Sequence, residues 1–191
     1  MIDLQTIDIQ PIANSRIQEL VENNIPFGAL YSDHMFLADY YDGEWHDARI
    51  VPYQNISLSP ANATLHYAIT VFEGMKAYKN PEGEVIAFRP KANAERLNIS
   101  GQRMCIPEVP QELFMEGLTQ LLKLDSAWVP SAVNTSLYIR PFVFATDEHI
   151  GIRPASNFRF MIITCPVGAY YSKPVSVKIE TEFASPVPPS T

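Results

Sequence analysis

The sequence HMFLADYYDGEWHDARIV, residues 34–51, decides the fold of the first part of the chain. Aromatic and β-branched residues dominate the runs 34–41 and 44–51, and this composition is typical of β-strands. Asp42-Gly43, which lies between the two runs, suits a type I′ turn, because both central residues of that turn need a positive φ. The stretch therefore predicts an antiparallel β-hairpin.

The residues after this hairpin predict a short helix and a second hairpin. Residues 65–72 favour a short helix that Gly74 stops. The runs 75–78 and 84–88 flank Asn-Pro-Glu-Gly at 80–83, and these residue types favour a turn. The second hairpin is therefore expected to have a longer connecting loop than the first.

Three further helices are expected from their starting residues and apolar faces. Ser15 is a possible N-cap for a short helix that ends near Asn23. Pro90 suits the first turn of a helix that extends to about Met104. A second proline-initiated helix follows Pro110, and its apolar residues recur on one helical face: Phe114, Leu118, Leu121 and Leu122.

The last third of the chain returns to strands, predicted at 135–145, 157–165 and 175–183. Hairpins, then two central helices, then strands again indicate an α+β domain. We expect a mostly antiparallel sheet with the helices on one face.

The end of the sequence predicts a connection rather than a further element. Pro186, Pro188 and Pro189 cannot donate to a strand ladder, so the tail from Ser185 is expected to be a linker. The expected organisation is a small domain over residues 1–172 and an interdomain linker over residues 173–191. The linker would lead to a large domain that lies outside this sequence.

Composition excludes several classes of protein. Hydrophobic residues make up 47% of the 191 residues and charged residues 18%, so an intrinsically disordered chain is excluded. The formal charge of −7 argues against binding to nucleic acid, which relies on Lys and Arg. The start of the chain does not resemble a signal peptide, and no apolar run is long enough to cross a membrane. Cys105 and Cys165 match no metal-ligand spacing, so we expect a cytoplasmic protein without a metal site.

Tyr138 and Arg140 are the first candidates for a binding site. In a strand they share one face, while Leu137 and Ile139 occupy the other. A guanidinium beside a phenol can recognise a carboxylate, because the two parallel N–H groups of Arg match its two oxygens. The alternative is a solvent-facing Tyr and Arg on a half-buried sheet.

Arg96 and two aromatic residues are weaker candidates when they are taken alone. Arg96 follows a strand-to-helix junction, from which it could reach a phosphate, or it could pair with Glu95 or Glu112 on the surface. Tyr67 and Phe72 could line an apolar pocket or could simply pack in the core. The sequence contains no glycine-rich phosphate loop, no nucleophile triad and no metal-ligand cluster, so we assign no catalytic residue.

Taken together, five segments resemble the amino-terminal half of the branched-chain amino-acid aminotransferases, which are class IV pyridoxal-phosphate enzymes. The similarity extends from about Phe27 to Phe183, and the segments occur in the order and at the spacing of the family. They are residues 53–60 (YQNISLSP), 65–67 with 72–78 (LHY and FEGMKAY), 88–90 with 95–97 (FRP and ERL), 136–141 (SLYIRP) and 165–170 (CPVGAY).

The resemblance implies a role for each matching residue. Arg96 matches the arginine that binds the cofactor phosphate, and Arg140 matches the arginine that receives the distal carboxylate of glutamate or 2-oxoglutarate. Tyr67, Ile150 and Ile152 match positions that reach the neighbouring subunit, which implies a homodimer. The pocket around the branched side chain is implied to include Phe27, Tyr67, Phe72, Tyr138 and Tyr170.

The resemblance also implies the activity and what this chain lacks. The family transfers the amino group of Leu, Ile or Val to 2-oxoglutarate and uses pyridoxal 5'-phosphate. Its Schiff-base lysine matches a position just past Thr191, and the carboxylate that pairs with the pyridine nitrogen lies further on. The chain alone is therefore expected to be catalytically incomplete.

Two alternatives remain open at the level of sequence. One keeps the class IV fold and changes the reaction to that of a D-amino-acid aminotransferase or an aminodeoxychorismate lyase. The other is a non-enzymatic module that binds a small carboxylate or a partner protein.

Overall fold

The structure is a computed structural model and describes residues 7–21, 25, 27–169 and 174–181. Its strands are β1 (Asp8–Ile9), β2 (His34–Tyr41), β3 (Glu44–Pro52), β4 (Thr70–Phe72), β5 (Met75–Lys79), β6 (Val85–Ala87), β7 (Ser136–Ala145) and β8 (Phe158–Val167). The helices are α1 (Ala63–Tyr67), α2 (Pro90–Arg103) and α3 (Gln111–Leu124), with 3₁₀ turns η1 (Ile17–Glu19) and η2 (Ser126–Trp128). None of the helices described is long and apolar enough to cross a membrane.

The predicted first hairpin is confirmed. Strands β2 and β3 pair antiparallel, and Tyr41 is opposite Glu44 across the turn. Asp42 and Gly43 have φ values of 53° and 84°, as the type I′ turn requires. The second hairpin, β5 with β6, is also confirmed.

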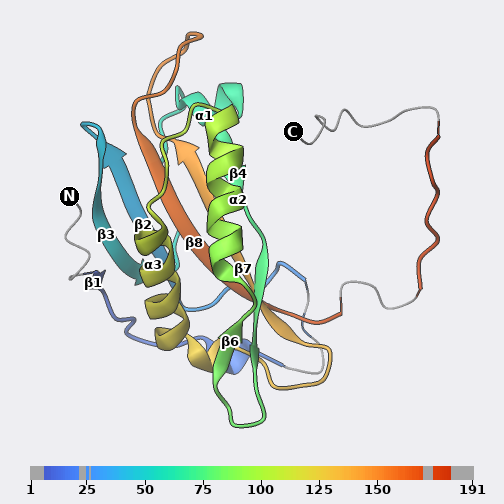
Figure 1. Cartoon of the computed structure of the whole chain (residues 1–191). Coiled ribbons are helices and arrows are strands. Elements are labelled where there is room, and N and C mark those ends of the chain that lie inside the picture. The colour runs from blue at the N-terminus through green and yellow to red at the C-terminus, as the bar shows by residue number, and fades with distance from the viewer. Residues whose placement is uncertain (1–6, 22–24, 26, 170–173, 182–191) are drawn as a thin grey trace.

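The strands form one sheet in the order β1-β3-β2-β8-β7-β5-β6, and β4 pairs with β7 beyond the end of β5. Among the described residues every pairing is antiparallel except the short β1–β3 pairing. Helices α2 and α3 lie against one face of the twisted sheet (Figure 1). The α+β architecture with helices on one face is therefore confirmed.

The main core lies between α3 and the sheet. The predicted apolar face of α3 is buried, and the ring of Phe114 stacks on that of Phe160 with centroids 5.6 Å apart. Gly117 brings the helix backbone against the ring of Phe36, which is fully buried. A Cβ added at Gly117 would lie 2.7 Å from Phe36 Cζ, so glycine is required by packing.

Gly117→Ala should therefore destabilise the chain, although alanine favours helices. Overpacking destabilises a core by about 1–3 kcal/mol, whereas the higher helix propensity of alanine stabilises by at most about 1 kcal/mol. The free energy of unfolding should therefore fall by roughly 1–2 kcal/mol. Gly101→Ala in α2 is the matched control, because its Cβ would meet Ile106 Cβ at an ordinary 3.6 Å. We expect the control to gain up to about 1 kcal/mol. Urea unfolding of both variants checks this, and equal changes would contradict the packing argument.

The opposite face of the sheet is only partly covered. It carries a smaller buried cluster formed by Met35, Leu37, Val51, Phe144 and Met161. Ile56 and Leu58, from the segment after β3, pack against this cluster. The β7 residues before Phe142 on this face, Tyr138 and Arg140, remain half-buried.

Three predicted elements were wrong in extent or type. Residues 65–72 do not form one helix: α1 ends at Tyr67, the C-cap Ala68 has a φ of 53°, and Thr70–Phe72 is strand β4. The helix predicted from Ser15 is only the turn η1, although the Ser15 hydroxyl does accept a hydrogen bond from Ile17 N at 3.1 Å. Residues 175–181 form no strand and are exposed, and the remainder of the predicted strand and tail lies outside the described residues.

Candidate functional site

Strand β7 places Tyr138 and Arg140 on the sheet face opposite the helices. Leu137 and Ile139 are fully buried on the helix side, so the predicted alternation is confirmed. Arg140 donates two hydrogen bonds to the Tyr138 hydroxyl, from Nε at 3.1 Å and from Nη2 at 2.7 Å. One edge of the guanidinium is therefore fixed.

Aromatic rings enclose this pair. The guanidinium carbon of Arg140 lies 4.2 Å from the centroid of the Phe72 ring, a cation–π contact. The Phe27 ring packs at 6.1 Å from that of Tyr138. A cavity of about 280 Å³ opens beside them, and its lining residues are Phe27, Gly28, Tyr31, Tyr138, Arg140, Ile163, Thr164 and Cys165.

Three consecutive residues, Phe72, Glu73 and Gly74, join this pair to helix α2. Phe72 is the last residue of β4, and Glu73 and Gly74 connect it to β5. Glu73 N donates to Pro141 O at 2.8 Å, which ties this link to β7. Phe72 contacts Arg140, while Gly74 faces Tyr138. A Cβ at Gly74 would lie 2.6 Å from the Tyr138 hydroxyl oxygen, so any other residue at this position would displace the Tyr138 side chain.

The middle residue of the link, Glu73, holds Arg96. Its carboxylate accepts from Arg96 Nε at 2.6 Å and from Nη2 at 2.5 Å, and Asn93 Nδ2 adds a third donor at 2.9 Å. The Glu73 side chain is 5% exposed, whereas that of Arg96 is 64% exposed. Arg96 therefore pairs with a buried carboxylate and with neither Glu95 nor Glu112, and its Nη1 has no hydrogen-bond partner in the described part of the chain.

The ion pair keeps both groups charged at neutral pH. Burial alone would raise the pKa of Glu73, but the hydrogen bonds from Arg96 and Asn93 and the charge of Arg96 outweigh burial and lower it below its ordinary 4.5. The hydrogen bonds and the charge of Glu73 raise the pKa of Arg96.

Glu73→Gln should lower stability in a pH-dependent way. We expect a loss of about 1–2 kcal/mol at pH 7, because a hydrogen-bonded charge is lost while its partner remains largely in solvent. The folded-state pKa of Glu73 lies below its unfolded value, so the contribution is present above about pH 4.5 and is lost as the pH falls through the folded-state pKa. Urea unfolding of both proteins between pH 7 and pH 3 checks this. A gap that widens toward low pH would contradict it.

The other predicted site residues are more dispersed. Tyr67 is half-buried and packs against the main core, and the cavity beside Arg140 is lined by neither Tyr67 nor Phe72. Ile150 and Ile152 are 72% and 99% exposed in the loop between β7 and β8. Tyr170 lies outside the described residues.

The structure adds residues that sequence reasoning missed. Glu73 and Asn93 orient Arg96. Asn93 lies one turn before Arg96 on α2, but no local signal in the sequence pointed to Glu73, which lies between β4 and β5. Tyr31, Thr164 and Cys165 line the cavity. Burial raises the pKa of the Cys165 thiol, so it is a neutral wall of the cavity, whereas Cys105 is exposed. No cluster of metal-ligating side chains occurs within the ranges that the structure describes.

The fold is that of the small domain of class IV aminotransferases. The structure aligns with an Escherichia coli branched-chain amino acid aminotransferase at a TM-score of 0.56 and 25% identity, over 72% of this chain and 41% of that chain. It also aligns with a T.th. branched-chain amino acid aminotransferase complexed with N-(5'-phosphopyridoxyl)-L-glutamate, at a TM-score of 0.50 and 25% identity. That alignment covers 67% of this chain and 40% of the other.

The relatives of this chain are branched-chain-amino-acid aminotransferases, so the resemblance found in the sequence is confirmed. The chain is 44% identical over 187 residues to branched-chain-amino-acid aminotransferase 2 of Bacillus subtilis. This alignment covers 96% of the present chain. The chain spans about half the length of the curated relatives it matches. No protein-family model matches it.

Proposed function

We propose that this chain is the amino-terminal half of a branched-chain amino-acid aminotransferase. The enzyme would transfer the amino group of Leu, Ile or Val to 2-oxoglutarate with pyridoxal 5'-phosphate. The observation that carries the proposal is the guanidinium of Arg140, which Phe72 and Tyr138 hold at the edge of an apolar cavity. The names of the relatives support the same activity.

Arg140 would let one pocket accept two kinds of side chain. The hydroxyl of Tyr138 uses Nε and one N–H of Nη2, while Nη1 makes no hydrogen bond within the described residues. These outer donors suit the distal carboxylate of glutamate or 2-oxoglutarate. Inside the cavity, the ring of Phe27 and the side chain of Ile163 offer apolar surface to a branched aliphatic side chain.

Arg96 fits the role of a phosphate ligand. Glu73 orients its guanidinium through two short hydrogen bonds, and the exposed Nη1 remains to donate. The solved relative with a phosphopyridoxyl group supports pyridoxal 5'-phosphate as the cofactor. When bound, this cofactor supplies an electron sink for the bond that is broken at the substrate α-carbon. The residues of this chain would then bind and orient the two ligands. Arg96 would bind the cofactor phosphate, and Arg140 would bind the distal carboxylate of the substrate.

The remaining machinery is proposed to come from outside residues 1–191. The lysine that links to the cofactor would lie in a large domain, so the chain alone would be inactive. Residues 1–172 would be the small domain and 173–191 the linker to the large domain. The exposure of Ile150 and Ile152 suits contact with the neighbouring subunit of a homodimer, as does their match to cross-subunit positions. The location would be cytoplasmic.

A chimeric enzyme tests the proposal. This chain replaces the aligned half of the Bacillus subtilis relative, and the chimera is assayed with L-leucine and 2-oxoglutarate. We expect L-leucine:2-oxoglutarate transamination and no use of D-alanine. A folded, cofactor-loaded chimera that prefers D-alanine would identify a D-amino-acid aminotransferase instead. One that processes no amino acid would favour a lyase or a binding module.

A further inference from the structure

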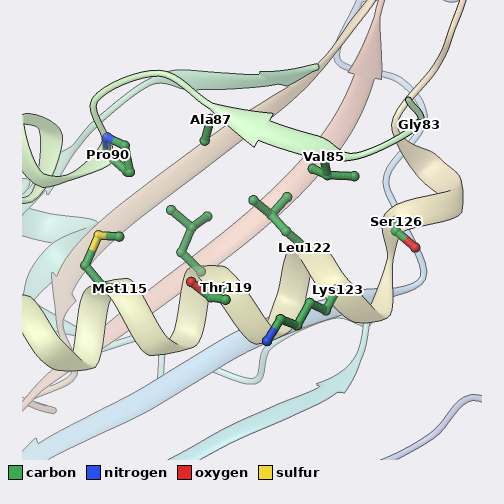
Figure 2. A pocket seen from close by; sticks show the side chains of 10 residues that line it. Gly83, Val85, Ala87, Pro90, Met115, Thr119, Leu122, Lys123 and Ser126 are labelled. Carbon is green, nitrogen blue, oxygen red and sulfur yellow. The ribbon is translucent and has the colours of Figure 1, made fainter. Parts of the chain in front are cut away.

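A second cavity lies on the helix side of the sheet, between β6 and α3 (Figure 2). Its volume is about 460 Å³, within the roughly 300–1,000 Å³ that small-molecule sites occupy. It lies on the opposite sheet face from Tyr138 and Arg140 and shares no lining residue with the cavity beside them. We call this cavity the β6–α3 groove, and its lining residues are Gly83, Val85, Ala87, Pro90, Met115, Leu118, Thr119, Leu122, Lys123 and Ser126.

The walls of the β6–α3 groove are apolar and come from two elements. Val85 and Ala87 project from β6 toward the helix, and Leu122 of α3 points back at Val85 across the gap (Figure 2). Met115 closes the end near Pro90 (Figure 2). Short side chains on β6 leave the gap unfilled, so the space between strand and helix stays accessible to an apolar guest.

The outer rim of the groove is polar and cationic. Thr119, Lys123 and Ser126 recur at spacings of four and three residues, which places them along one side of α3 and its continuation. Within the described residues, the two hydroxyls and the Lys123 ammonium have no intramolecular hydrogen-bond or ion-pair partner. The carboxylate of Glu84 on the neighbouring turn accepts a hydrogen bond from Asn80 Nδ2 at 2.9 Å.

We propose that the β6–α3 groove binds an aliphatic carboxylate of about six to eight carbons. The alkyl chain would lie between Val85 and Leu122, where water is replaced by apolar contact. The carboxylate would accept hydrogen bonds from Lys123 Nζ and the Thr119 hydroxyl, and the positive charge of Lys123 selects an anion over an amine. The match of an apolar trough to the Lys123 cation at its rim favours a monocarboxylate over a dicarboxylate.

Isothermal titration of the purified 191-residue chain with octanoate tests this site. Saturable 1:1 binding is expected, and octylammonium should bind at least tenfold more weakly. Lys123→Gln should weaken octanoate binding roughly tenfold by removing the charge. Ala87→Leu should fill the groove and reduce octanoate binding at least tenfold, because the added side chain points at α3. Arg103→Gln, at the far end of α2, makes the same change of charge and should leave binding unchanged.

The outcomes separate cleanly once circular dichroism shows that each variant is folded. Weaker binding in both groove variants with normal binding in Arg103→Gln supports the proposal. The proposal is overturned by the absence of saturable binding, by equal binding of octylammonium, or by octanoate binding that either groove variant leaves unchanged. None of these results depends on transaminase activity. The test of octanoate binding is therefore independent of the test of the proposed function.

Discussion

Arg140→Ala is expected to lower kcat/KM of the chimeric enzyme for 2-oxoglutarate by two to three orders of magnitude, and that for L-leucine by less than about fivefold. The reason is that 2-oxoglutarate brings a second carboxylate into the pocket, and without Arg140 that charge would be desolvated beside apolar walls. Removing one partner of such a buried charge pair costs about 2–5 kcal/mol, which corresponds to this loss. Steady-state kinetics with each substrate varied in turn measures both values.

Two further variants make this result specific. Arg140→Lys keeps the charge but loses the planar donor pair that Tyr138 orients, so it should recover only part of the activity with 2-oxoglutarate. Arg103→Ala removes an exposed arginine of α2 and should leave both substrates unaffected. Equal losses for leucine and 2-oxoglutarate in Arg140→Ala would refute the role given to Arg140.

Arg96→Ala is expected to weaken the affinity of the chimera for pyridoxal 5'-phosphate by roughly a hundredfold. A charged hydrogen bond to phosphate contributes about 1.5–3 kcal/mol, and the variant also leaves the buried carboxylate of Glu73 facing the phosphate without its partner. Fluorescence titration of the cofactor-free chimera gives the affinity directly. If the variant keeps the wild-type affinity and circular dichroism shows an intact fold, Arg96 does not bind the cofactor phosphate.

Glu73→Gln separates the orienting role from the binding role at this position. It keeps Arg96 but loses the carboxylate that holds Nε and Nη2. Cofactor affinity should therefore change by much less than in Arg96→Ala, since the cation remains available to the phosphate.

Local signals in the sequence were sufficient for the hairpins and the two long helices. Asp42-Gly43 favours the turn that is observed, and the apolar period of α3 favours the face that is buried, so each local pattern agrees with the tertiary structure. The boundary between α1 and β4 depends on tertiary contacts instead. The Thr64 hydroxyl lies within hydrogen-bond distance of Ile69 O and Ala145 O, which ties the first turn of α1 to the segment after the helix and to the end of β7. The composition of residues 65–72 does not predict these tertiary hydrogen bonds.

The strand predicted at 175–183 failed for a related reason. Val175, Val177 and Ile179 alternate as in a strand, yet all three are exposed and no described strand pairs with residues 174–181. A strand needs a neighbour for its backbone hydrogen bonds, and alternation alone does not provide one. The assignment of 173–191 as an interdomain linker remains a prediction.

The candidate site was predictable only in part. Strand periodicity placed Tyr138 and Arg140 on one face, because they lie two residues apart. The partner of Arg96 was missed because Glu73 is 23 residues distant in sequence and is brought to α2 by the pairing of β4 and β5 with β7. Nearby carboxylates such as Glu95 are exposed and project elsewhere.

The position of the lysine to which the cofactor is linked shows which half of the enzyme supplies the catalytic group. The cofactor-loaded chimera is reduced with borohydride, digested and mapped by mass spectrometry. We expect one phosphopyridoxyl label, on a lysine of the Bacillus subtilis half, and none within residues 1–191. Lys76 is the critical position within this chain, because it is exposed and pairs with Tyr138 across β5 and β7. A label on Lys76, or on any other lysine of residues 1–191, would contradict the claim that this chain supplies only the binding half of the site.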